Sequence, residues 1–179
     1  MGEMHVPLLE TERLILRAPR LEDYPAHTAI WSDPRTRRYF SEVPFCEEDN
    51  WLRFQRSFGH WVLFGYGFWA LEEKGSGTYL GGLGFLHAHR DISIDYRDMP
   101  ESAWVLAPDF HRRGLAREAM QAALTWADRN ISATESWCMI DPGNIPSERL
   151  AIGLGYRPDN SILYKGRAMQ TYLRSRGTA

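Results

Sequence analysis

The sequence predicts one domain of the α/β (α+β) class, in which about four helices flank a central sheet. Its 179 residues can bury a real core, because 44% are hydrophobic and 25% are charged. Segments with strand periodicity and segments with helix periodicity alternate along the chain, without repeats, low-complexity tracts or linkers. We therefore expect a single domain over residues 1–179, with its core between about 10 and 174.

The first third of the chain predicts one strand followed by two helices. Residues 13–17 predict a strand that places Leu14 and Leu16 on one face. Helical spacing then covers 21–31, and an Asp-Pro pair breaks it before a short basic segment at 35–38. An amphipathic helix that begins with acidic residues is expected over 47–61.

The middle of the chain predicts three strands. Two of them, 66–73 and 78–86, are joined by Lys-Gly-Ser-Gly at 74–77, which is typical of a hairpin turn. Residues 90–100 form a charged loop, and a short apolar strand includes 104–106.

The last third predicts a helix from Gly114 to about 130, a strand over 134–140 and a further helix over 145–154. Two closing strands are expected around residues 162–164 and 169–173.

The stretch 103–119 carries the clearest functional signal, because a strand, a turn and a helix follow one another there. Pro108 ends the strand, since proline has no amide hydrogen and favours extended geometry before it. The first turn of any helix leaves its amide hydrogens unpaired and directed outward. Here those amides belong to Arg113, Gly114, Leu115 and Ala116.

Small side chains and positive charge favour a phosphate at this turn. Gly114 and Ala116 let a phosphate approach the backbone, and Arg112, Arg113 and Arg117 add positive charge around it. Pyrophosphate is the ligand that this arrangement predicts. The alternative is a plain turn glycine beside solvated arginines. The sequence has neither the Gly-Lys-Ser/Thr of a P-loop nor a Gly-x-Gly-x-x-Gly before this helix.

Charge and cysteine content exclude several classes of protein. With 21 basic and 23 acidic residues, the net charge of −2 argues against nonspecific nucleic-acid binding. Cys46 and Cys138 are far apart and predict reduced thiols in a cytoplasmic protein. The amino terminus lacks the features of a signal peptide, and the longest apolar run, 61–71, is too short to span a bilayer. His87 and His89 have no third ligand nearby, so we expect no metal.

The order of elements and four motifs resemble the GNAT superfamily of acetyl-coenzyme A (acetyl-CoA) dependent N-acyltransferases. The superfamily signature is Gln or Arg, two residues, Gly, one residue, then Gly or Ala; residues 111–116 read His-Arg-Arg-Gly-Leu-Ala and depart from it only at His111. Three further motifs look like the ribosomal-protein N-terminal acetyltransferase (Rim-type) branch. They are Glu-Thr-Glu-Arg-Leu-Ile-Leu-Arg at 10–17, Glu-x-x-Trp at 101–104, and Asn-x-x-Ser-x-x-Leu with Leu-Gly-Tyr at 144–156.

The resemblance implies a mixed, mostly antiparallel sheet that splays where acetyl-CoA binds. The pantetheine arm of acetyl-CoA would run along Trp104 and Leu106 like an added strand, opposite the strand at 134–140. Asn144 resembles a position near the pantetheine, and a simple helix cap is an equal alternative. The pyrophosphate would lie on the turn made by His111, Arg112, Arg113, Gly114, Leu115, Ala116 and Arg117.

The implied reaction is direct attack of an amine on the thioester. Glu101 is the candidate base, since it begins the site strand and shares a face with Ala103; the alternative is an ordinary surface carboxylate. Ser147 is the candidate acid for the departing thiolate, unless it only occupies the first turn of its helix. Cys138 lies on the adjacent strand, where a buried structural thiol is the simpler interpretation.

The acceptor amine is the least determined part of the prediction. Residues 20–65 and the loop 87–100 are expected to select it. The branch resemblance favours a protein N-terminal α-amine, and an unperturbed α-amine, with a pKa near 8, needs little help to become neutral. A small amine such as a polyamine or aminoglycoside, or a catalytically silent acetyl-CoA sensor, are the alternatives. Monomer and homodimer are both open.

Overall fold

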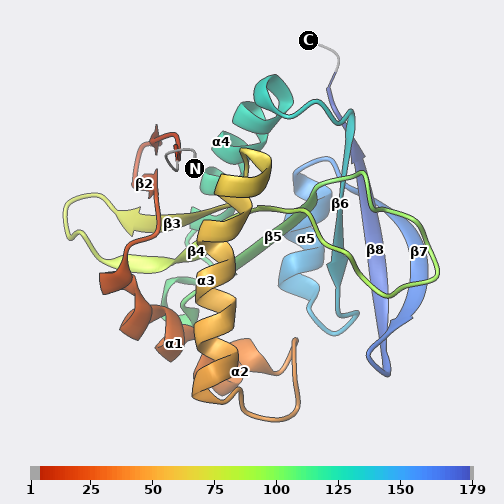
Figure 1. Ribbon diagram of the computed structural model, residues 1–179, viewed down its shortest axis with the longest axis horizontal. Coiled ribbons are helices and arrows are strands. Elements are labelled where there is room, and N and C mark those ends of the chain that lie inside the picture. The colour runs from red at the N-terminus through yellow and green to blue at the C-terminus, as the bar shows by residue number, and fades with distance from the viewer. Residues whose placement is uncertain (1–4, 178–179) are drawn as a thin grey trace.

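The computed structural model describes residues 5–177, which form one α/β domain around an eight-stranded sheet (Figure 1). Residues 1–4, on which part of the expectation about targeting signals rests, lie outside the described residues. The strands are β1 (Leu9–Glu10), β2 (Leu14–Arg17), β3 (Phe68–Glu73), β4 (Tyr79–Leu86), β5 (Glu101–Leu106), β6 (Glu135–Ile140), β7 (Arg157–Tyr164) and β8 (Arg167–Ser175).

The sheet is mixed and mostly antiparallel, as expected. Its strand order is β1-β2-β3-β4-β5-β6-β8-β7, and β5 with β6 is the one parallel pair among the described strands. The helices are α1 (Tyr24–Ser32), α2 (Pro34–Arg37), α3 (Glu47–Phe64), α4 (Leu115–Asn130) and α5 (Ile145–Gly153), with short 3-10 turns at Leu21–Asp23 and Pro108–Phe110.

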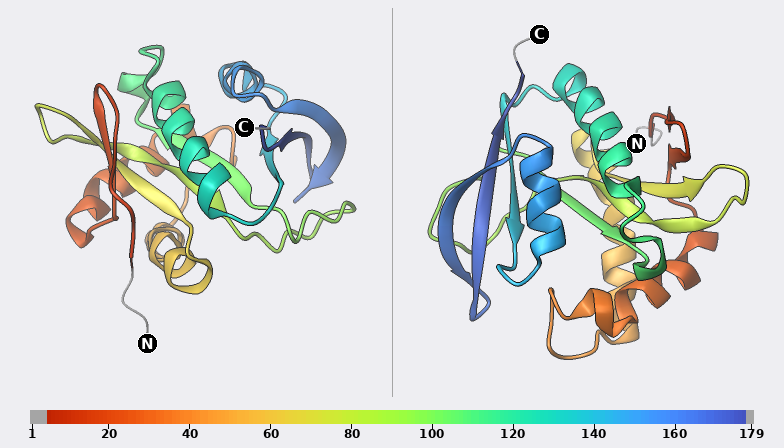
Figure 2. Two further views of the ribbon diagram at one scale, coloured as in Figure 1. Left: turned by 90° about the horizontal axis from the view of Figure 1, so that it is seen from above. Right: turned by 180° about the vertical axis from the view of Figure 1, so that it is seen from behind.

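Helices α3 and α4 cover opposite faces of the sheet (Figure 2). The buried side of α4 consists of Leu115, Ala119, Met120 and Ala123, whose spacing places them on one helical face. They belong to the main core, between α4 and the sheet. A second, smaller cluster joins Ile30 and Trp31 of α1 to Val105 of β5 on the other face.

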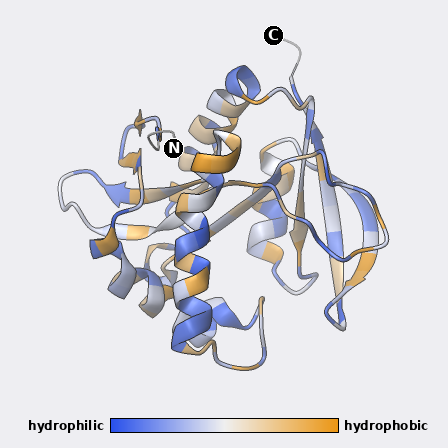
Figure 3. Cartoon of the chain, in the orientation of Figure 1, coloured by the Kyte–Doolittle hydropathy of each residue, from blue (hydrophilic) through white to orange (hydrophobic). Residues whose placement is uncertain are grey.

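Helix α3 changes character along its length (Figure 3). Its first turn carries Glu47, Glu48 and Asp49, where negative charge stabilises the helix N-terminus. Its last turn is apolar, and Leu63 there is 74% exposed. In residues 5–177, no helix has the length and apolar character that a membrane crossing requires.

The four expected helices are present, together with one short additional helix. Five α-helices are present in the described chain instead of about four, because residues 34–37 are helical and not merely a basic segment. The Asp-Pro pair that ends α1 also begins α2: the Asp33 carboxylate accepts a hydrogen bond from the Arg35 amide (2.8 Å), and Pro34 occupies the first helical position. The short β1 was not expected, and β7 begins at Arg157, before the predicted closing strand.

The sheet opens between β5 and β6. Strand β4 pairs with β5 along its length, from Gly81 opposite Leu106 to Leu86 opposite Glu101. Strand β6 pairs with β5 only where Glu101 lies opposite Trp137. Beyond that point the two strands diverge, which leaves a gap at the carboxyl end of β5.

Candidate active site

The backbone of β5 presents free hydrogen-bonding groups to this gap. In an antiparallel pair, the backbone groups of successive residues point alternately toward and away from the partner strand. The Ala107 amide donates to the Leu80 carbonyl (2.8 Å), so with this register Val105 bonds to β4, while Trp104 and Leu106 direct their amides and carbonyls into the gap. An extended ligand that forms hydrogen bonds with a strand backbone therefore fits beside β5. It would lie along Trp104 and Leu106, the two residues that the resemblance indicates.

The turn before α4 has the backbone geometry of an anion site. Gly114 adopts φ 76° and Arg112 adopts φ 61°, both in the left-handed region. Such alternation turns successive amides inward to form a concave anion nest. Within residues 5–177, the amides of Gly114, Leu115, Ala116 and Arg117 have no hydrogen-bond acceptor. The residues present therefore fit a pyrophosphate at this turn.

The arginines around the turn differ in their availability. Arg113 is shared with Glu73, to which its Nη2 lies at 3.1 Å. Arg112 and Arg117 form no salt bridge with the described residues, and the Arg117 guanidinium lies near the end of α5, close to Gly153. Two of the three predicted cations are thus free to meet a phosphate, and Arg113 is partly neutralised.

A network from the start of β2 holds the turn in place. Arg13 donates from Nη1 to the Arg113 carbonyl (2.8 Å) and from Nε to the Glu118 carboxylate (2.7 Å). The Thr11 hydroxyl donates to the same carboxylate (2.6 Å). Thr11 and Arg13 belong to the motif at 10–17, for which the sequence alone predicted no role. Its role in the fold is to fasten the turn and the first turn of α4 to the sheet.

The His111 imidazole contacts the strand and not the free amides of the turn. Its Nε2 lies 2.9 Å from the Leu106 carbonyl oxygen, one of the groups directed into the gap. This contact closes the connection between β5 and α4. The residue that departs from the signature therefore has a structural contact of its own.

Glu101 is buried at the point where β5 and β6 separate. Its side chain is 5% exposed, and both carboxylate oxygens accept hydrogen bonds from Arg90, from Nε at 2.8 Å and from Nη2 at 2.6 Å. Arg90 also donates to the Tyr164 hydroxyl (2.9 Å). Glu101 is therefore a buried carboxylate and not the surface carboxylate that was the alternative. Arg90 and Tyr164 fasten the loop 87–100 and the end of β7 to Glu101.

Ser147 lies beside the gap with its hydroxyl proton available. The Trp104 indole Nε1 donates to the Ser147 Oγ (3.2 Å), and in the described chain this hydroxyl donates to no other group. The Ser147 amide donates to the Asn144 side chain (3.3 Å), so Asn144 caps α5. Ser147 and Trp104 are thus brought together, while Glu101 lies on the other face of β5.

Tyr156 is a site residue that sequence reasoning missed. Its hydroxyl hydrogen-bonds to Ser136 (2.9 Å) on β6 and to Ser102 on β5, and so bridges the two strands next to the gap. Burial raises the pKa of Tyr156 to about 12, so this bridge is neutral at pH 7. Burial also raises the pKa of the Cys138 thiol, which suits a structural thiol. Only the Leu-Gly-Tyr motif marked this position.

The two histidines at the end of β4 belong to an aromatic cluster. His87 stacks on Phe64 with ring centroids 4.4 Å apart, and its Nδ1 lies 3.3 Å from the Tyr66 hydroxyl. The His89 ring lies edge-on to His87 at 5.0 Å. In residues 5–177 no group of three potential ligands is placed to hold a metal ion.

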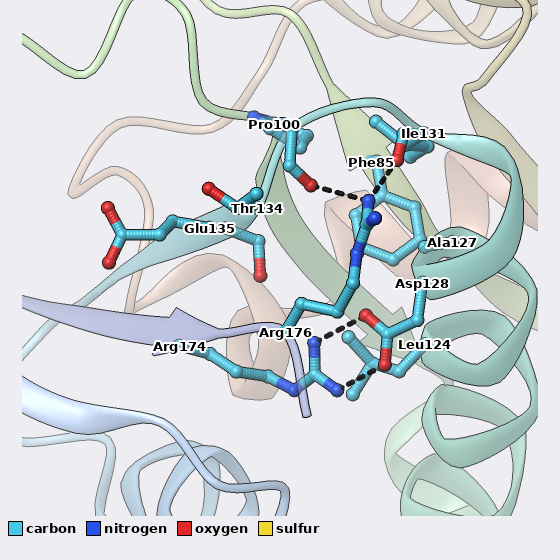
Figure 4. Close-up of a pocket in the computed structure, with 12 residues that line it drawn as sticks. Phe85, Pro100, Leu124, Ala127, Asp128, Ile131, Thr134, Glu135, Arg174 and Arg176 are labelled. Carbon is cyan, nitrogen blue, oxygen red and sulfur yellow. Dashed lines mark hydrogen bonds and ion pairs between the residues drawn. The ribbon is translucent and has the colours of Figure 1, made fainter. Parts of the chain in front are cut away.

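A small cavity at the other end of α4 is structural (Figure 4). Arg174 forms a two-bond ion pair with Asp128 (2.8 and 2.6 Å). Arg176 extends into the cavity and donates to the carbonyls of Ile131 and Ala133. The 16 residues of α4 separate this cavity from the phosphate turn by about 24 Å. Its arginines hold the end of β8 against the end of α4.

Comparison with known proteins agrees with this geometry. Residues 13–157 match the family model described as an acetyltransferase (GNAT) domain. The chain is 25% identical over 161 residues to the uncharacterized N-acetyltransferase YoaA of Bacillus subtilis, covering 87% of this chain and 86% of that protein. The solved structure of a putative GNAT-family acetyltransferase from Bordetella pertussis superimposes with a TM-score of 0.83 at 31% identity, covering 95% of this chain and 100% of that one.

Two more distant structures share the fold and differ in acceptor. One is a ribosomal-protein α-N-acetyltransferase in complex with coenzyme A, with a TM-score of 0.75 at 15% identity over 94% of this chain and 98% of that one. The other is a spermidine N-acetyltransferase from Vibrio cholerae in complex with coenzyme A and spermine, with a TM-score of 0.71 at 15% identity over 93% and 97%. With its open sheet, the backbone geometry of the turn before α4 and these matches, the chain belongs to the GNAT acetyltransferase family and is an acetyl-CoA-dependent acyltransferase.

Proposed function

We propose that the enzyme acetylates the α-amine at the N-terminus of a protein or peptide. The observation that carries this proposal is the pairing of both Glu101 oxygens with Arg90. A carboxylate engaged in this way is suited to an amine that is already partly neutral. An α-amine, with a pKa of about 7.7–8.0, meets that condition near pH 7, whereas a lysine-like amine with a pKa of about 10.4 does not. The motifs shared with the Rim-type branch support the same choice.

In the proposed reaction the amine attacks an acetyl thioester that acetyl-CoA supplies. Trp104, through its amide and carbonyl, and Leu106, through its amide, would hold the pantetheine, since the Leu106 carbonyl is contacted by His111. The turn at 111–116 would hold the pyrophosphate. Glu101 would receive the proton of the amine, directly or through a water molecule. Each carboxylate oxygen accepts one hydrogen bond from Arg90 and has a second lone pair, which the amine or the water would use.

Ser147 would pass a proton to the thiolate as it departs, directly or through a water molecule, and would regain its own proton from the solvent. Its Oγ already accepts a hydrogen bond from Trp104, which leaves its own proton directed elsewhere. The backbone amide of Leu106 or Trp104 in the gap would polarise the thioester carbonyl. Glu101 and Ser147 thus lie on opposite faces of β5, and the thioester carbonyl would lie between them.

The test is a screen of free-thiol release from acetyl-CoA with three classes of acceptor: peptides with free N-termini, polyamines and aminoglycosides. We expect turnover with peptides and loss of that turnover when the N-terminus is blocked while an internal lysine stays free. Turnover restricted to polyamines or aminoglycosides would overturn the N-terminal assignment. Coenzyme A binding without turnover on any amine would instead identify a cofactor sensor.

A further inference from the structure

Arg53 of α3 carries a charge that has no partner in the described chain. Its guanidinium lies 4.0 Å from the centre of the Trp31 ring and 4.4 Å from that of Phe45. Its Nε is fully enclosed and has no hydrogen-bond partner in residues 5–177. No carboxylate of these residues lies within salt-bridge distance of Arg53. The two rings hold the guanidinium in place, but they satisfy none of its N–H groups.

The nearby carboxylates are occupied by other groups. Asp49, one helical turn before Arg53, accepts hydrogen bonds from the amide and the thiol of Cys46 (both 3.2 Å). Asp23 forms a two-bond ion pair with Arg17 (2.8 and 2.7 Å). Glu101 is held by Arg90. These three carboxylates are thus engaged with other groups, and none of the salt bridges among residues 5–177 includes Arg53.

Arg53 is partly buried, and a buried N–H group without a hydrogen-bond partner, such as its Nε, is costly. Burial, together with the charges of Arg56 and Arg90, lowers the pKa of Arg53 to about 10, although Asp49 opposes this shift. Arg53 therefore remains positive at pH 7. Its unpaired donors and its planar, fixed geometry suit a carboxylate from outside the chain.

The position of Arg53 relates it to the acceptor side of the active site. Trp31, on which it stacks, packs against Val105 of β5. Val105 and Glu101 are four residues apart on one strand, so their side chains lie on the same face. The charge of Arg90, the partner of Glu101, is close enough to act on Arg53. Arg53 thus faces the side of β5 where the amine would approach Glu101.

We propose that Arg53 binds a carboxylate of the acceptor, so that the preferred acceptor is a primary amine with an acidic group close to it. This inference rests on the proposed function and narrows it to peptides with an acidic side chain next to the N-terminus. A free amino acid would present the same chemistry through its own carboxylate. Polyamines are disfavoured, because Arg53 and Arg90 would repel their second ammonium group.

The experiment compares two peptides that differ only by Glu or Gln at the second residue. It also compares free glutamate with glutaminamide, in which amides replace both carboxylates. For the wild-type enzyme we expect kcat/KM to favour the acidic peptide by about tenfold or more, as a charge-assisted hydrogen bond would. Arg53→Met, which keeps the apolar stem of the side chain, should bring that ratio close to one. Arg53→Lys should restore part of it. Arg56→Met, an exposed arginine on the same helix, is the matched control and should retain the preference.

The outcomes separate this inference from the proposed function. Peptide turnover without an acidic preference, or an unchanged Glu/Gln ratio in Arg53→Met, would overturn the role of Arg53 and leave the N-terminal assignment intact. Equal loss on both peptides with a lowered Tm would show that Arg53 only stabilises the helices. Preference for free glutamate over glutaminamide, without turnover of any peptide, would support carboxylate binding by Arg53 and overturn the N-terminal assignment. If no acceptor turns over, calorimetry with the two peptides and coenzyme A decides, and equal affinities would overturn the inference.

Discussion

Arg13 and Glu118 are 105 residues apart in sequence and form a two-bond ion pair beneath the phosphate turn, with Nε–Oε2 at 2.7 Å and Nη2–Oε2 at 2.6 Å. The same arginine reaches the Arg113 carbonyl, so one side chain connects the start of β2 to both the turn and α4. The pair is partly exposed, and its importance lies in the geometry it imposes on the turn rather than in global stability.

Glu118→Gln should therefore weaken coenzyme A binding by about threefold to tenfold, because the turn loses its fixed position. Isothermal calorimetry measures the affinity. Arg129→Met, at the exposed far end of the same helix, is the matched control and should bind as the wild type does. An unchanged affinity in Glu118→Gln would show that the turn holds its shape without this pair.

Gly114→Glu should abolish acetyl-CoA binding. Gly114 has φ 76°, where any side chain is strained, and a carboxylate there would repel a phosphate. Gly114→Ala separates the two causes, because it adds the strain without the charge and should retain weakened binding. Gly59→Glu, at an open position on α3, controls for the added charge. Calorimetric affinity equal to that of the wild type would remove the pyrophosphate from this turn.

Glu101→Gln should lower turnover more at pH 6.5 than at pH 8.5. At the lower pH more of the amine is protonated and needs a group to take its proton, whereas at the higher pH an α-amine is already mostly neutral. A pH–rate profile of kcat/KM on a peptide acceptor measures this difference. A loss that is the same at both pH values would instead indicate that Glu101 serves only to hold Arg90 and its loop.

Ser147→Ala should reduce kcat by about tenfold to a hundredfold with little change in coenzyme A affinity, because the acid acts on the departing thiolate. Single-turnover kinetics measure the chemical step. The control is Ser161→Ala, in which an exposed hydroxyl on β7 is removed far from the gap. Full activity in Ser147→Ala would show that the serine has only a structural role in the first turn of α5.

His27 should make the protein less stable in mild acid. Burial, reinforced by the positive charge of Arg53 and opposed by Asp23, lowers the pKa of His27 from 6.5 to about 4. The folded state disfavours the protonated ring. The contribution of neutral His27 to the free energy of unfolding is therefore complete above about pH 6.5 and is lost as the pH falls toward 4. The difference amounts to about 3 kcal/mol in the free energy of unfolding. Urea unfolding between pH 7 and pH 4.5 measures it.

His27→Gln should flatten that dependence, whereas His60→Gln, a less buried histidine on α3, should leave it unchanged. A wild-type stability that does not fall between pH 6.5 and pH 4.5 would contradict the prediction.

Local patterns in the sequence predicted most of the fold. The helix from Gly114, the hairpin at 74–77 and the strand at 134–140 are determined by residues close together in the chain, and the structure has all three within a few residues. The short α2 was missed because Asp33-Pro34 has two meanings: it ends one helix and begins the next.

The site was predicted less completely, because its supporting contacts join distant parts of the chain. Thr11 and Glu118 are 107 residues apart in sequence, and the hydrogen-bonded pair Tyr156 and Ser102 is 54 residues apart. Arg53 is an ordinary helix residue in the sequence, and its isolation is visible only once the acids around it are found with other partners. Arg90 lies in a loop without a recognisable sequence pattern, and only its ion pair with Glu101 in the structure relates it to the site.

The single rung between β5 and β6 divides the sheet into a five-stranded part and a three-stranded part. A ligand that lies in the gap supplies the hydrogen bonds that the missing rungs would have made, and it touches both parts at once. Coenzyme A at a hundred times its dissociation constant would add about 2.7 kcal/mol to folding. Amide hydrogen exchange at Leu106 should then slow in proportion to the coenzyme concentration. The donor would thus act as a removable structural strand, and the supply of acetyl-CoA would influence how much of this enzyme stays folded.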